Sequence, residues 1–157
     1  MLRHMLAVLL LPFVVTVIVP TYLLGQFGAG EPALWQRAAG VLLFAAGFSL
    51  FAWCVSLFVR VGRGTLAPWD PTQALVAVGP YRYVRNPMIS GVAGILLGEA
   101  LYFGSVALLA WGVAFVSINH IYFVLSEEPG LERRFGESYR QYKASVPRWM
   151  PRIKPKL

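Results

Sequence analysis

The residues best suited to chemistry gather in one polar stretch, residues 79–91, which lies between two long apolar blocks. Positions 81–85 of this stretch hold two tyrosines and two arginines. Asn86 and Pro87 then predict a helix start, because Asn caps helices well and Pro suits the first helical position. A helix N-terminus beside arginines attracts a carboxylate or a phosphate. An ordinary cytoplasmic loop with topology-setting arginines explains the pattern equally well, so both interpretations stay open.

Two consecutive acids, Glu127 and Glu128, follow the last apolar block. Acidic side chains are unfavourable at a helix C-terminus because of the helix dipole. Either the helix continues or a cation compensates the charge, and the Pro-Gly pair that comes next argues against simple continuation. A cationic ligand, Arg82 or Arg85 would each explain the placement.

Two ionisable residues lie inside apolar blocks, where each needs an explanation. Glu99 either faces a pocket or sits close enough to the membrane surface to reach water. His120 precedes Glu127 by seven residues, and such positions nearly coincide on an α-helix, which predicts a polar stripe from His120 to Glu127. A hydrogen bond between helices explains His120 as well as a functional role does. With two histidines and one cysteine in the chain, no metal site is expected.

Composition indicates an integral membrane protein with a single membrane domain, residues 1–157. The chain is 57% hydrophobic and 13% charged, with a mean hydropathy of +0.61, which is too apolar for an ordinary soluble domain. Its apolar blocks reach the ~20 residues that a helix needs to cross a bilayer. The basic residues that give the net charge of +7 lie beside these blocks. We therefore attribute them to membrane topology and expect no nucleic-acid partner.

Two membrane helices are predicted before the polar stretch. The first covers residues 2–24, and its two prolines predict a kink in which neighbours or Ser/Thr satisfy the freed carbonyls. The second covers residues 33–59, where Gly40 and Gly47 would let a neighbouring helix approach closely.

A tight hairpin of two more helices is predicted after the polar stretch. The apolar run from residue 87 to 125 is too long for one membrane helix, and residues 102–105 form the natural break. The fold class is therefore all-α with four transmembrane helices. The predicted segments are 1–60 (first two spans), 61–86 (cytoplasmic loop), 87–126 (helical hairpin) and 127–157 (cytoplasmic tail).

The cations predict the orientation. In a four-span arrangement every lysine and arginine except Arg37 falls on one side, so that side, with both termini, should be cytoplasmic in a bacterial or archaeal membrane. The tail predicts one amphipathic helix on this surface, with an apolar stripe and an i,i+4 pair of Arg133 and Glu137. Residues 148–151 are typical of an interfacial anchor. The stripe consists of Leu131, Phe135, Tyr139 and Tyr142.

The ordered set of motifs resembles the isoprenylcysteine carboxyl methyltransferase and phospholipid methyltransferase superfamily. The matching motifs are Gly79-Pro80-Tyr81, Arg85-Asn86-Pro87, Glu127-Glu128-Pro129, the segment 135–142 and Val146-Pro147-Arg148. The resemblance covers about half the chain. It implies a small membrane enzyme that binds S-adenosyl-L-methionine at the cytoplasmic face and methylates a membrane-borne acceptor, such as an isoprenylcysteine-type carboxylate or a phospholipid amine.

The resemblance also implies site residues. Asn86 stands where the family more often has His, and Ile89 where it has Tyr, which affects adenosine contacts and substrate preference. The chemistry of the residues themselves makes Arg85 and His120 the candidate catalytic residues. Arg85, or the helix N-terminus at Asn86, would hold the cofactor carboxylate, and His120 would take a proton from an amine or line the acceptor tunnel. The resemblance implies the cofactor-binding residues Gln73, Ala74, Leu75, Val76, Tyr81, Asn86, Pro87, Met88, Ile89 and Glu127, and we add the adjacent Glu128 as a further candidate.

Two other functions fit parts of the sequence. Membrane reductases of the sterol-reductase type share some of this architecture, although no dinucleotide fingerprint is present. A small transporter or assembly partner without enzymatic activity would use Glu99 and His120 as a proton relay.

Overall fold

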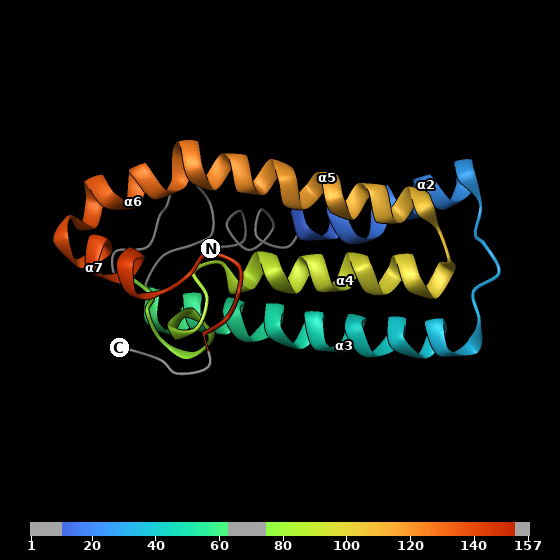
Figure 1. Ribbon diagram of the computed structural model, residues 1–157, viewed down its shortest axis with the longest axis horizontal. Coiled ribbons are helices and arrows are strands. Elements are labelled where there is room, and N and C mark those ends of the chain that lie inside the picture. The colour runs from blue at the N-terminus through green and yellow to red at the C-terminus, as the bar shows by residue number, and fades with distance from the viewer. Residues whose placement is uncertain (1–10, 63–74, 153–157) are drawn as a thin grey trace.

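Every regular element that the computed structural model describes is helical, as predicted, and it describes residues 11–62 and 75–152. The long helices run side by side; at one end α6 continues from α5, and the short C-terminal helix α7 turns back beneath it (Figure 1). The elements in chain order are η1 (Val14–Ile18), α2 (Val19–Phe27), α3 (Leu34–Leu57), η2 (Phe58–Gly62), η3 (Gly79–Arg82), α4 (Pro87–Phe103), α5 (Val106–Tyr122), η4 (Phe123–Glu127), α6 (Glu128–Phe135) and α7 (Glu137–Ser145), where η marks a π or 3₁₀ turn.

Two helical stretches, Leu34–Leu57 and Val106–Phe135, are long and apolar enough to cross a membrane. Leu11–Phe27 and Pro87–Phe103 are apolar but shorter. Four membrane crossings therefore stay a prediction, and the start of the first one, residues 2–10, lies outside the described residues. Near its prolines this helix contains the π turn η1, and the Thr16 hydroxyl donates to the Pro12 carbonyl (2.8 Å).

Helices α3 and α4 meet through glycines, which confirms the prediction for Gly40 and Gly47. A Cβ atom at Gly40 would lie 2.7 Å from the Gly98 carbonyl oxygen, and one at Gly47 would lie 2.6 Å from that of Gly91. These distances are too short for any side chain, so the two backbones are in direct contact. Because the helices are antiparallel, Gly40 near the start of α3 faces Gly98 near the end of α4, and Gly47 faces Gly91.

The predicted hairpin break is also confirmed. Helix α4 ends at Phe103, and Gly104 adopts the left-handed conformation (φ 59°) that commonly follows a helix. Ser105 then caps α5 by accepting a hydrogen bond from the Leu108 amide (3.5 Å).

The C-terminal tail differs from the single amphipathic helix that was predicted. It forms two helices, because Gly136 takes a positive φ (54°) that breaks the stripe between Phe135 and Tyr139. Glu137 consequently pairs with Arg140 (3.4 Å) in α7 instead of with Arg133. The two apolar halves still share a surface, since Leu131 and Phe135 pack against the buried Tyr139, Tyr142 and Val146.

The helix containing Glu127 continues, contrary to the expectation from the Pro-Gly pair. Residues 106–135 are helical throughout. The apolar part ends at Ser126, within the π turn η4, and α6 follows directly. Pro129 falls in the first turn of α6, where the π turn relieves the loss of a backbone donor.

Candidate functional site

The polar stretch and the tail meet at one end of the bundle. Helix α4 begins at Pro87 as predicted, but Asn86, which precedes it, forms no side-chain capping hydrogen bond. The tail crosses this loop: the Arg85 amide donates to the Pro147 carbonyl (2.9 Å), and the Arg152 amide donates to the Tyr83 carbonyl (3.1 Å). We call residues 146–152 the C-terminal strap. The tail is therefore part of the site and more than the interfacial anchor that was predicted.

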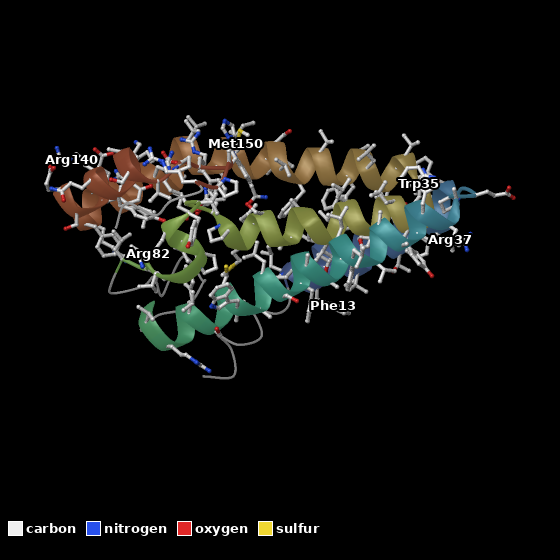
Figure 2. All side chains as sticks on the ribbon, turned by 60° about the horizontal axis from the view of Figure 1, so that its bottom comes forward. Phe13, Trp35, Arg37, Arg82, Arg140 and Met150 are labelled. Carbon is white, nitrogen blue, oxygen red and sulfur yellow. The ribbon has the colours of Figure 1, made fainter. Side chains whose placement is uncertain are left out.

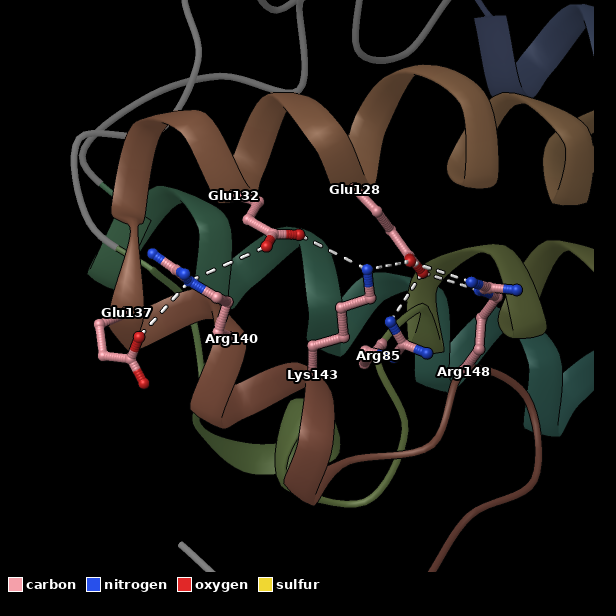
Figure 3. Close-up of polar contacts among 7 residues, drawn as sticks. All are labelled: Arg85, Glu128, Glu132, Glu137, Arg140, Lys143 and Arg148. Carbon is pink, nitrogen blue, oxygen red and sulfur yellow. Dashed lines mark hydrogen bonds and ion pairs between the residues drawn. The ribbon is translucent and has the colours of Figure 1, made fainter.

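An ion cluster is centred on Glu128, which is 5% exposed (Figure 3). Arg85 donates to it through Nη1 (2.8 Å), and Arg148 through Nε and Nη2 (2.7 and 2.9 Å). Lys143 lies 3.6 Å away. Burial alone would raise the pKa of Glu128, but the Arg148 hydrogen bond and the surrounding cations hold it below its usual value. Glu128 is therefore ionised, and both explanations offered for the acidic pair, continuation and a compensating cation, apply.

The π turn changes which acid lies on the face of His120. A π turn adds one residue to a helix, and one residue corresponds to about 100° of rotation. Glu128, and not Glu127, thus lies on the same face of the helix as His120. Two consecutive strap residues confirm this: Arg148 binds Glu128, while Trp149 Nε1 donates to His120 Nδ1 (3.0 Å). The predicted stripe from His120 to Glu127 was therefore wrong in its second member.

Glu127 has a different environment from its neighbour. It lies just past the apolar part of the long helix and is partly buried. Burial and the neighbouring Glu128 raise the pKa of Glu127 to about 7. No ion pair or hydrogen bond within residues 11–62 and 75–152 compensates this carboxylate. The two acids thus differ: cations balance the charge of Glu128, whereas Glu127 has no compensating partner among the described residues.

Tyr81 lies in the core. The residue is 7% exposed, and its ring lies 5.7 Å from that of Phe58, centroid to centroid. Its carbonyl accepts a hydrogen bond from the Tyr142 hydroxyl (2.8 Å), which fastens η3 to α7. Tyr81 thus connects the end of α3 to the tail.

The other described residues implied for the cofactor pack in three different apolar clusters. Val76 and Met88 pack in the same cluster as Tyr81, and Leu75 packs under the tail. Ile89 contacts the core between α4 and α5. Gln73 and Ala74 lie outside the described residues.

Glu99 belongs to another part of the molecule. It lies in the last part of α4, towards the hairpin, and its Oε2 is buried with no hydrogen-bond partner among the described residues. A cavity of about 740 Å³, lined almost entirely by apolar residues of α2, α5 and the hairpin, lies at that end as well. Glu99 and this cavity are therefore remote from the ion cluster.

Arg148 and Lys143 were missed as site residues. Nothing in residue periodicity links them to Glu128, because the ion pairs join separate helices and a loop. The signal was the motif Val146-Pro147-Arg148, which places Arg148 within the resembling segments.

A family model described as phospholipid methyltransferase matches residues 35–138. This is more than half of the chain, and it extends from the start of α3 into α7. No curated protein and no solved structure matches the chain.

Proposed function

The chain belongs to the phospholipid methyltransferase family, and we propose that it transfers a methyl group from S-adenosylmethionine to a lipophilic acceptor in the membrane. Family membership supports methyl transfer over the reductase and transporter alternatives. Two helices apolar enough to span a bilayer support membrane association.

The main support for this proposal is that a basic residue, Arg85, and an acidic residue, Glu127, lie at the same end of the bundle. The amino-acid part of S-adenosylmethionine carries a carboxylate and an ammonium. Arg85 Nε is buried with no hydrogen-bond partner among the described residues, so it can donate to that carboxylate. Glu127, which has no compensating partner among residues 11–62 and 75–152, would supply a carboxylate for the ammonium. The residues present therefore fit the cofactor.

The cofactor supplies an activated methyl group, so the chain mainly has to position it and exclude water. The Glu128 cluster fixes the Arg85 side chain, and the strap fixes the backbone at Arg85 and Tyr83. Both contacts hold the loop before α4 against the tail. Among the predicted residues, Arg85 and Glu127 would contact the cofactor, whereas Glu128 and Tyr81 would support them.

We further propose that this end of the bundle faces the cytoplasm. Arg82 and Arg140 lie at the end with the ion cluster, while Arg37 lies at the opposite end (Figure 2). An excess of arginine and lysine favours the cytoplasmic side.

Calorimetry in detergent tests the cofactor assignment. S-adenosylhomocysteine should bind to the purified protein, and NADPH should not. Transfer of a tritiated methyl group from S-adenosylmethionine into extracted membrane lipids should then identify the acceptor. Binding of NADPH instead would support a reductase.

A further inference from the structure

The cavity of about 740 Å³ beside the hairpin is an apolar slot between α2 and α5, which lie next to each other at that end (Figure 1). Its α5 wall is formed by three alanines on one face of the helix, Ala107, Ala110 and Ala114, whose short side chains leave the space open. Leu23 and Phe27 of α2 form the opposite wall. None of the described residues that line the cavity is charged. We call it the α2–α5 slot.

Two contacts fix the walls of the slot relative to each other. Beside the hairpin, the Gly30 amide donates to the Phe103 carbonyl (2.9 Å), and a Cβ atom at Gly30 would lie 2.6 Å from the Gly104 carbonyl oxygen. Deeper in the bundle, the indole N–H of Trp111 in α5 donates to the Val15 carbonyl of the first helix (3.0 Å). The slot is therefore a built part of the fold.

The surroundings of the slot indicate what fills it. Water does not occupy an apolar cavity, because a buried water needs several polar partners. An empty slot would lose dispersion contacts along both walls. Its open side is continuous with the apolar surface that these helices turn outwards, since Phe27 and Val106 line the slot and are exposed. In a bilayer, the material in contact with this surface is hydrocarbon.

The length of the slot matches one leaflet of a bilayer. Its α5 wall extends from Ser105 to Ala114, and at about 1.5 Å per residue this is about 14 Å. Half of a hydrocarbon core of ~30 Å is about 15 Å. A single extended chain that starts at the membrane surface beside the hairpin would therefore end at the deep end of the slot.

We propose that the α2–α5 slot binds one acyl chain of a bilayer phospholipid, in the leaflet at the hairpin end. This inference rests on the membrane placement contained in the proposed function and is independent of methyl transfer. The chain runs along α5 from Ser105 towards Ala114 and completes the packing of the first helix on α5. The bound lipid thus stabilises the end of the bundle that is remote from the ion cluster.

The first test maps the chain by photolabelling in phosphatidylcholine vesicles. One probe carries a diazirine halfway along an acyl chain, and a second carries it at the methyl end. Mass spectrometry of peptides should find the mid-chain label near Ala107 and the methyl-end label near Ala114. Peptides of α3 around Ala38, which is exposed at a comparable depth, should carry only background label. Equal labelling of α3 and α5, or no order with depth, would overturn the inference.

The second test fills the slot. Ala110→Phe places a ring in it, and Ala38→Phe is the matched control, because both alanines follow the first residue of their helix by four positions. Ala110→Phe should lower the labelling of α5 to the background of α3. Phosphatidylcholine added to the delipidated protein in detergent should raise Tm of the parent and of Ala38→Phe, but not of Ala110→Phe. Unchanged labelling or an unchanged rise in Tm in Ala110→Phe would overturn the inference.

A smaller substitution covers the case in which Ala110→Phe does not give a monodisperse protein. Ala107→Leu also fills part of the slot and should lose the same label and the same rise in Tm. Both variants should bind S-adenosylhomocysteine as the parent does, because the slot is remote from Arg85 and Glu127. If the parent failed to bind S-adenosylhomocysteine while the slot still held a lipid, the proposed function would fail and this inference would stand.

The third test addresses a second copy of the chain, the other apolar occupant. Native mass spectrometry of protein released from nanodiscs should show a monomer that retains a phospholipid, and Ala110→Phe should lose that lipid. A dimer that becomes a monomer in Ala110→Phe would overturn the lipid assignment in favour of self-association.

Discussion

Replacing Glu128 by Gln should destabilise the fold through its effect on three cations. The amide can still accept hydrogen bonds, but Arg85, with 12% of its side chain exposed, loses its counter-charge. Removing one partner of a buried ion pair costs about 3–5 kcal/mol. The pairs with Arg148 and Lys143 are 22% and 40% exposed on the basic side, so solvent screens them in part. We therefore expect a loss of about 2–4 kcal/mol.

Thermal unfolding in detergent, followed by intrinsic fluorescence, measures this loss. For a chain of this size, 1 kcal/mol corresponds to about 2–4 °C, so Tm should fall by roughly 4–16 °C. Glu132→Gln is the matched control, because this acid also pairs with Lys143 but is 38% exposed. Its effect should stay below about 1 kcal/mol. Equal shifts in the two variants would refute the argument that burial makes the Glu128 cluster strong.

The same residue predicts a pH dependence. Because its pKa is lowered in the folded state, Glu128 contributes stability above the ordinary value of 4.5, and this contribution is lost as the pH falls below it. Tm of the parent protein should therefore decrease more steeply in acid than Tm of Glu128→Gln. Parallel curves would contradict the lowered pKa.

Three further predictions concern other parts of the molecule. Glu127→Gln should weaken binding of S-adenosylhomocysteine by about 2–5 kcal/mol. It should also abolish the rise in affinity as the pH passes about 7, where Glu127 ionises. Calorimetry on either side of that pH measures both effects, and unchanged affinity would remove Glu127 from the site. Gly47→Ala should lower stability by about 1–3 kcal/mol because its methyl group meets the α4 backbone, whereas Gly25→Ala, which meets nothing within 4 Å, should not; equal Tm values would contradict the close contact. A cysteine at Lys156 should react with impermeant reagents only from the cytoplasmic side of vesicles, and labelling from outside would reverse the orientation.

Local signals in the sequence were sufficient for the helix boundaries near the site. Pro87 marked the start of α4, because proline fits the first turn of a helix. The Gly104-Ser105 pair marked the hairpin, because glycine fits the left-handed position after a helix and serine caps the next one. Gly40 and Gly47 likewise indicated a close helix contact. In each case the physical cause lies in the residue itself or in its nearest neighbours.

The arrangement of the acids depended on features that no local signal reveals. The π turn at residues 123–127 rotates the following residues, so the seven-residue spacing from His120 pointed to Glu127 and not to Glu128. The burial of Glu128 depends on Arg148, twenty residues later in the chain. The break at Gly136 was hidden because the apolar stripe continues across it.

The backbone contact between α3 and α4 restricts how the protein can open. Where side chains form an interface, rotamer changes let two helices slide or separate gradually, but glycine carbonyls lying against a backbone leave no such freedom. Separating α3 from α4 would break the whole contact at once. Helices α4 and α5 meet through side chains such as Leu96, whose Cβ lies 3.6 Å from the position of a Cβ at Gly112. We therefore expect α3 and α4 to move as one rigid pair, with any adjustment of the bundle taking place between α4 and α5.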